Sequence, residues 1–311
     1  MRIAYPARAR ARRHADPGPD PMPKGELFAI LSALAWALGV IAFTRLGDRL
    51  SPLALNLRKN LLVLAMLAPL VVLRDGFAWP PLAGADLAIA LASGVIGIGL
   101  ADTLYFRALN RLGAGRMGIV GNFYSPFVLV LSFVFLGERL SALRGVGFLL
   151  VSTGVLVIGT PRGVSGIDHQ AMRRGIALGV LAVLLMAIAI VMVKRVLERH
   201  DVLWVSTVRM AGGVAGMLML LPFLAAPAER ARLDRRGWIL LVGAAFIGQL
   251  VAMLLWLAGY KYTSASIAAI LNESASIFIV LLAWLLLREP LTRRKLVGVG
   301  FTLSGVACML A

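Results

Sequence analysis

The 311-residue chain has little of what catalytic and metal-binding sites are usually built from. It holds one cysteine, Cys308, so no intrachain disulfide and no cysteine-based zinc or redox motif can form. Its three histidines, His14, His169 and His200, fall in expected tails or loops. The sequence shows no serine–histidine–aspartate set, no cluster of metal ligands and no glycine–lysine phosphate loop. We therefore expect no enzyme, no metal, no cofactor and no ATP-driven pump.

Charge is also scarce, at 15% of the residues, while hydrophobic residues make up 60%. A soluble domain has about 25% charged residues. The apolar residues form runs of about 20, the length that crosses a hydrocarbon core of about 30 Å. Because barrel strands would alternate polar and apolar residues, the sequence predicts an all-α membrane protein.

The net charge of +17 does not indicate nucleic-acid binding. Most basic residues flank the apolar runs, as they do beside membrane segments. The one dense basic tract, MRIAYPARARARRH, has no folded nucleic-acid module around it. We expect residues 1–23 to form a disordered basic tail, and we expect membrane lipid instead of nucleic acid as a partner.

The apolar runs predict ten transmembrane helices joined by short polar turns. The longest connection, a linker at residues 161–173, separates a five-helix repeat at 24–160 from a second at 174–311. The expected spans cover residues 25–45, 52–73, 86–107, 113–136, 143–160, 174–194, 203–225, 237–259, 264–287 and 295–311.

An internal repeat supports this division. Glu138 in LGERL and Glu289 in LREPL lie 151 positions apart (289 − 138). At the same offset, without a gap, Arg58 coincides with Arg209 and Ile96-Gly97 with Ile247-Gly248. Further coincidences are Ser125 with Ser276, Phe127 with Phe278, Gly147 with Gly298 and Gly154 with Gly305. Matched arginine, glutamate and glycine indicate duplication, because chance would pair mainly leucine and valine.

An odd number of helices in each copy makes the second copy enter the membrane from the opposite side. The fold is therefore expected to be two inverted five-helix repeats related by a pseudo-two-fold axis in the membrane plane. That architecture recurs in secondary transporters, whose substrate sites lie near the midplane between the repeats.

Both copies carry one pattern: an aromatic-x-x-alanine, a small-residue turn, a long apolar helix, a turn with glutamate and a glycine-rich last helix. The first copy reads ADTLYFRALNRLGAGRMGIV and then SPFVLVLSFVFLGERLSALRGVGFLLVSTGVLVIG. The second reads AGYKYTSASIAAILNESASIFIVLLAWLLLREPLTRRKLVGVGFTLSGVACML. Over about residues 22–311 the chain resembles the EamA-type drug/metabolite transporter superfamily. It departs from the pattern at Arg288-Glu289-Pro290, where the first copy has Gly137-Glu138-Arg139.

The resemblance implies ten helices, cytoplasmic termini, a central cavity and alternating access. It also implies transport of amino acids, nucleobases, sugars or other metabolites, often by export. We expect a multi-pass exporter of a small polar metabolite in the plasma (inner) membrane, as a monomer or a homodimer. Any active transport would couple to an ion gradient, such as protons, or to substrate gradients alone.

The candidate substrate site is predicted from polar residues inside the apolar runs, because a charge at the bilayer centre costs about 2.5–3.5 kcal/mol. Glu273 lies near mid-depth, beside Asn272 and Ser276. Its repeat partner, Asn122, lies beside Tyr124, so the two clusters are expected to line one cavity. Glu273 either binds a cationic group, or titrates during transport, or pairs with an arginine for packing.

Three further charged residues are candidates. Asp102 either faces the cavity or caps a helix end together with Arg107. Arg58 and Arg209 are matched copies, so we expect them to have the same role, each in its own half. That is either structural pairing and snorkelling towards a headgroup, or binding of a substrate carboxylate. Among the aromatic residues Trp36 joins Tyr124 as a site candidate, whereas Tyr105, Trp256 and Trp284 are expected to pack or to face lipid.

Two other functions stay open. One is multidrug or cation efflux, for which Glu273 would replace the acidic residue that small multidrug exporters carry deep in their first helix. Here that helix has only Glu26, at its start. The other is a membrane-embedded transferase, which should cluster ionisable residues at one membrane face. The mid-depth position of the polar residues favours transport.

Overall fold

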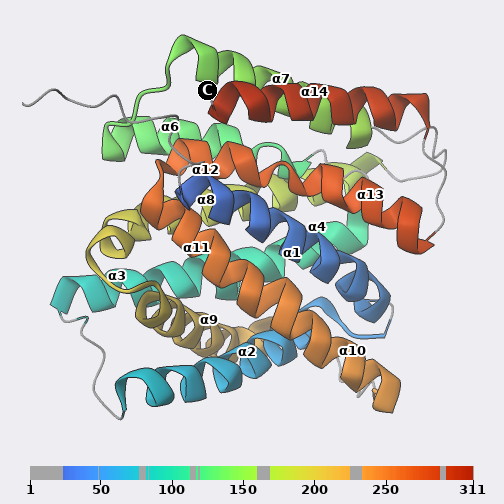
Figure 1. Cartoon of the computed structure of the whole chain (residues 1–311). Helices are drawn as coiled ribbons and strands as arrows, with labels where there is room; N and C mark the ends of the chain where they lie inside the picture. The colour runs from blue at the N-terminus through green and yellow to red at the C-terminus, as the bar shows by residue number, and fades with distance from the viewer. Residues whose placement is uncertain are drawn as a thin grey trace, which may run out of the picture.

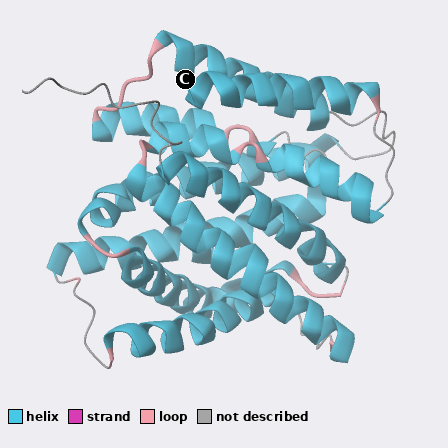
Figure 2. Ribbon diagram, viewed as in Figure 1, coloured by secondary structure: helices cyan, strands magenta, loops and turns pink. Residues whose placement is uncertain are grey.

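The computed structural model describes residues 24–47, 49–76, 82, 84–112, 117, 120–159, 169–224, 233–287 and 292–310 (Figure 1). Within these residues the fold consists of helices without strands (Figure 2). The predicted tail at 1–23 lies outside the described residues. So do residues 161–168 of the predicted linker, whose remaining residues are already helical.

The helices of the first half are α1 (Lys24–Gly47), α2 (Pro52–Asp75), α3 (Gly84–Gly94), α4 (Asp102–Leu112), α6 (Tyr124–Leu136) and α7 (Ala142–Gly159). Those of the second half are α8 (His169–Arg199), α9 (Val202–Leu224), α10 (Arg235–Ala245), α11 (Ala252–Tyr262), α12 (Ala265–Asn272), α13 (Ala275–Leu287) and α14 (Arg293–Leu310). Two π-helical segments, η1 (Val95–Ala101) and η2 (Phe246–Val251), join α3 to α4 and α10 to α11.

Within the described chain, seven helical stretches are long and apolar enough to cross a membrane. They are Lys24–Gly47, Pro52–Asp75, Gly84–Leu112, Met172–Arg199, Val202–Met219, Arg235–Tyr262 and Ala265–Leu282. Two shorter apolar helices cover Tyr124–Leu136 and Ala142–Val157. The prediction of a helical membrane protein is confirmed at this level.

Helix starts follow from local sequence. The Ser51 hydroxyl accepts a hydrogen bond from the Ala54 amide, and Pro52 occupies the first turn of α2, where a missing N–H does no harm. Asp234 caps α10 through the Gly237 amide, 2.8 Å away. These caps satisfy amides that a helix cannot pair internally, and so fix where the spans begin.

The element boundaries recur at the offset found in the sequence. α3 begins at Gly84 and α10 at Arg235, 151 positions later. The same spacing separates the starts of α6 and α13 and those of α7 and α14. η1 and η2 also begin 151 positions apart, at Val95 and Phe246, so each half has its π-helical segment at the equivalent point.

Glycine pairs allow the helices of the two halves to approach closely. α7 and α14 lie side by side as a pair at the top of Figure 1. A Cβ on Gly147 would meet the Gly305 carbonyl oxygen at 2.9 Å, and one on Gly154 would meet the Gly298 carbonyl oxygen at 2.5 Å. Since Gly147 matches Gly298 and Gly154 matches Gly305 at the repeat offset, each contact is the counterpart of the other.

The first helix of each half packs into the other half. α1 contacts η2, α11, α12 and α13, whereas α8 contacts α3, η1, α4 and α6. The halves therefore interlock, and residues from both can surround one central space.

The crossing of α1 and η2 gives a stability prediction. A Cβ on Gly39 would lie 2.4 Å from the Gly248 Cα, so Gly39→Ala should push α1 away from η2 and lower the thermal unfolding midpoint. Gly300→Ala is the matched control, because a Cβ there meets nothing within 4 Å. Alanine exceeds glycine in helix propensity by about 1 kcal/mol, so the control should unfold at the same temperature or higher. Equal midpoints for both variants would contradict the close crossing.

Candidate functional site

Two helices are interrupted at equivalent points in the middle of the fold. α12 ends at Asn272, and a turn at Glu273 and Ser274 precedes α13. In the first half a turn at Asn122 and Phe123 precedes α6. The sequence match of Glu273 with Asn122 therefore coincides with a match in structure. Broken helices leave backbone and side-chain polar groups available at membrane depth, where they can bind a substrate.

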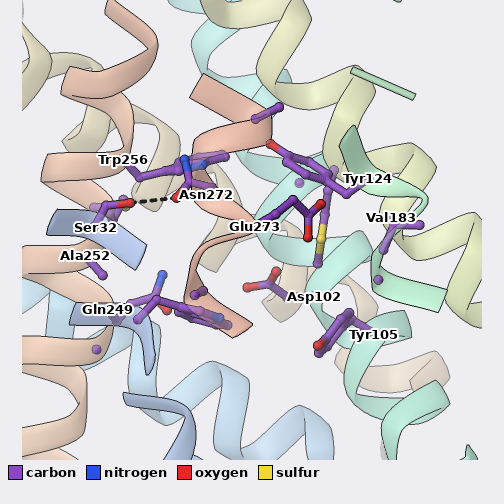
Figure 3. A pocket seen from close by; sticks show the side chains of 18 of the residues that line it. Ser32, Asp102, Tyr105, Tyr124, Val183, Gln249, Ala252, Trp256, Asn272 and Glu273 are labelled. Carbon is purple, nitrogen blue, oxygen red and sulfur yellow. Dashed lines mark hydrogen bonds between the residues drawn. The ribbon is translucent and has the colours of Figure 1, made fainter. Parts of the chain in front are cut away.

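A cavity of about 350 Å³ lies beside these breaks (Figure 3). Its walls come from α1, η1, α4, α6, α8, α9, η2, α11, α12 and α13. Among the nine residues predicted for the site, eight line it: Trp36, Asp102, Asn122, Tyr124, Arg209, Asn272, Glu273 and Ser276. In the view of Figure 3, Tyr124 and Tyr105 lie on one side of Glu273 and Asp102, and Trp256 and Gln249 lie on the other.

The ninth predicted residue, Arg58, lies outside the cavity. It is partly exposed on α2, and its guanidinium carbon lies 6.0 Å from the centre of the Trp238 ring. Arg209 is only 2% exposed, donates from Nε to Ser93 Oγ at 2.9 Å and lies 5.6 Å over the Trp256 ring. The expectation that the two matched arginines do the same thing is wrong, because their helices present them to different surroundings.

The basic residue that α2 does bury is Lys59, which the sequence interpretation overlooked. Its side chain is 0% exposed, and its Nζ forms an ion pair with Asp102 Oδ2 at 3.5 Å. The ammonium also lies 5.5 Å from the Phe43 ring and 5.4 Å from the Phe106 ring. A signal was present in the sequence: at the repeat offset both Lys59 and Asp102 are replaced by methionine, at Met210 and Met253.

Asp102 thus pairs with Lys59 at the junction of η1 and α4, and it lines the cavity. Tyr105 and Trp256 also line the cavity, contrary to the expectation that they pack or face lipid. These two residues are repeat partners (105 + 151 = 256), so the halves contribute one aromatic side chain each from the same position.

Glu273 is held by a neighbouring helix. Ser125 Oγ lies 2.6 Å from its Oε1 and donates to it, and that hydroxyl also lies 3.3 Å from the Ala269 carbonyl oxygen. The neighbouring amide of Asn272 accepts from Ser32 Oγ at 2.8 Å and donates to the Ala268 carbonyl oxygen at 2.8 Å. Glu273 therefore has a hydrogen-bonding serine, and no ion pair with an arginine is formed in the described part of the chain.

Several polar atoms at the cavity are left without a hydrogen-bond partner among the described residues. They are Asn122 Nδ2, Arg209 Nη1 and Gln249 Oε1, all buried. Unpaired buried polar atoms are costly, by about 1–3 kcal/mol each. Two donors and one acceptor are thus available to a ligand with complementary groups.

Glu138 has a structural role at the end of α6. Its carboxylate accepts hydrogen bonds from the Ala265 and Ser266 amides, at 2.7 and 2.9 Å, and from Ser266 Oγ at 2.8 Å. It therefore caps the N-terminus of α12 in the opposite half, where a negative charge is favoured. Its predicted partner in the repeat, Glu289, lies outside the described residues.

Apolar helices of spanning length around a cavity that holds several polar side chains are features of multi-pass membrane transporters. The chain belongs to the EamA-like transporter family, which matches it twice, over residues 23–160 and 173–311. The predicted resemblance is thereby confirmed.

Individual relatives agree with this assignment. Two proteins of Archaeoglobus fulgidus, each named an uncharacterized transporter, are 26% and 23% identical to the chain. The first alignment covers 89% of this chain and 95% of the relative, and the second covers 91% and 97%. A solved structure described as "Crystal structure of protein" shares the fold, with a TM-score of 0.77 over 91% of this chain and 95% of its own, at 18% identity. The family and these relatives point to a transporter and not to an enzyme.

Proposed function

We propose that the chain is a secondary transporter that exports small polar metabolites, such as amino acids or nucleobases, by alternating access around the central cavity. The observation that carries this proposal is the pair of broken helices. Each half places a polar side chain, Asn122 or Glu273, at its break and beside the same cavity. A substrate held there would contact both halves at once.

Alternating access requires two halves that can exchange roles, and we propose ten membrane spans arranged as two inverted five-helix repeats. The recurrence of helix boundaries at the 151-residue offset supports duplication. The reciprocal glycine contacts of α7 and α14 support a two-fold relation. Continuity of α3, η1 and α4, and of α10, η2 and α11, supports counting each as one span. We further propose that both termini are cytoplasmic and that the membrane is the plasma (inner) membrane.

The cavity carries groups of both signs, which supports a substrate with both donors and acceptors. Arg209 and Asn122 offer unpaired donors to a carboxylate or carbonyl oxygen. Asp102 and Glu273 offer acceptors to an ammonium or N–H group. Trp36 adds flat apolar surface beside them. A volume of about 350 Å³ lies at the lower end of the range for small-molecule pockets, about 300–1,000 Å³.

Cation or multidrug efflux remains the second candidate. The observation that favours it is the presence of two carboxylates, Asp102 and Glu273, in one cavity with tryptophan rings that can pack on a cation. Arg209 opposes it, because its guanidinium would repel a purely cationic ligand.

Metabolite profiling separates these candidates. Cells that overproduce the protein and cells that lack it are compared for small molecules in the medium. Export of metabolites predicts that one amino acid or nucleobase rises outside the overproducing cells and falls outside the deletion cells. Unchanged metabolites together with raised resistance to a cationic drug would favour efflux. No difference in either would refute the proposed transport.

A further inference from the structure

The Lys59–Asp102 ion pair stands out because its ammonium group is fully buried among apolar helices of spanning length. Lys59 is 0% exposed between two phenylalanine rings, and its only carboxylate partner in the described chain is Asp102 at 3.5 Å. The Asp102 side chain keeps 21% exposure and faces the cavity. A ligand can therefore reach the carboxylate but cannot reach the ammonium group.

The fold does not need this pair. At the repeat offset the second half has Met210 and Met253, which are 0% and 6% exposed. The polar neighbours change as well, since Asn60 is replaced by Ala211 and Thr103 by Leu254. Methionine pairs and ion pairs can fill similar volumes, and apolar replacement of a buried ion pair is often neutral or stabilising. The second half thus shows that these helices can pack without the charges.

Among the described residues, no second carboxylate pairs with Lys59. The Phe43 ring covers it from α1, and η2 brings the neutral Gln249 to the cavity. The other titratable or charged groups at the cavity are Tyr105 on α4, Tyr124 on α6, Arg209 on α9 and Glu273 at the break after α12. Lys194, the counterpart of Phe43, pairs with Glu198 near the end of α8, away from the cavity. Within the part of the chain that the structure describes, Asp102 is therefore the counter-ion of the Lys59 ammonium.

We propose that the Lys59–Asp102 pair exchanges a proton for a cationic group of the substrate, which couples transport to a proton gradient. The substrate's ammonium group binds the Asp102 carboxylate and displaces the Lys59 ammonium. Because the ammonium itself does not reach the cavity, its proton passes to the Asp102 carboxylate and from there to water in the cavity, which leaves Lys59 as a neutral amine and the carboxylate free to hold the substrate's ammonium group. When the substrate leaves, the amine takes up a proton and the ion pair forms again.

The net charge at this site is the same with and without bound substrate. One positive charge faces the Asp102 carboxylate at all times, either the Lys59 ammonium or the substrate's ammonium group. One proton moves for each substrate bound. This inference rests on the proposed transport function and adds the coupling ion and the residues that exchange it.

The test uses the purified full-length protein in liposomes, with a mixture of radiolabelled protein amino acids as the probe. Counterflow at equal pH on both sides tests the proposed function. Accumulation with the vesicle interior about two pH units more acidic tests the coupling. One-for-one exchange sets a limit of about 100-fold accumulation, because one pH unit corresponds to a factor of ten.

The wild type is expected to show counterflow, to accumulate the probe under the pH gradient and to release about one proton per probe molecule bound. Lys59→Met should keep counterflow, because Asp102 remains, but should lose the gradient-driven accumulation. Counterflow by the wild type without proton release, or equal gradient-driven accumulation in both proteins, would overturn the coupling and leave the transport function standing. Absence of counterflow in the wild type would overturn amino-acid transport and, with it, the proposed exchange at Asp102.

Discussion

Replacing Arg209 with methionine should reduce transport of the identified substrate by at least about thirtyfold. Arg209 is 2% exposed at the cavity, and one of its terminal nitrogens has no partner among the described residues. Loss of one partner of a buried charged contact costs about 2–5 kcal/mol, and about 1.4 kcal/mol is a factor of ten. Initial rates of counterflow in liposomes measure the effect.

Arg58→Met is the matched control, because Arg58 is the repeat partner of Arg209 but lies outside the cavity against Trp238. Its transport rate should stay within about threefold of the wild type, since an exposed or partly exposed charge contributes about 0–1 kcal/mol. Equal losses in the two variants would mean that Arg209 acts through the fold and not through the substrate.

Removing only one member of the Lys59–Asp102 pair should destabilise the protein far more than removing both. Asp102→Met leaves the fully buried Lys59 without its acceptor, at a cost of about 3–5 kcal/mol, and Lys59→Met should cost less because the Asp102 side chain keeps 21% exposure at the cavity. Lys59→Met/Asp102→Met reproduces the residues that the second half has at Met210 and Met253. The double variant should therefore unfold within a few degrees of the wild type. Thermal unfolding in detergent checks the order of the four proteins.

The double-mutant cycle gives the energy that couples the two residues. A strong favourable coupling is expected, because the two single losses share one cause. If the losses of the single variants simply added in the double variant, the two side chains would act independently, and the comparison with the second half would not apply.

The helical membrane fold followed from sequence alone, because apolar runs of spanning length admit few alternatives. The offset of 151 also paired Asn122 with Glu273, and in the structure both residues lie in turns at matched positions. The breaks themselves were not predicted. A local interruption of a few residues changes neither the length nor the hydropathy of a run.

The orientation of side chains was the weakest part of the prediction. Arg58 and Lys59 are neighbours in the same apolar run, and hydropathy cannot decide which of them faces inward. In the structure Lys59 is buried and Arg58 lies against Trp238. Trp256 was assigned to packing or lipid because most aromatic residues of a membrane helix are placed there. Its position at the cavity depends on how α11 packs, which no local pattern records.

Alternating access requires a cavity that opens to each side of the membrane in turn, and site-directed labelling tests this most directly. Cys308→Ser removes the one native cysteine, and Ser276→Cys then places a thiol in the cavity. A membrane-impermeant maleimide is applied to right-side-out and to inside-out vesicles. Alternating access predicts labelling from both sides and loss of transport after labelling. Labelling from one side only, with transport unchanged, would contradict it.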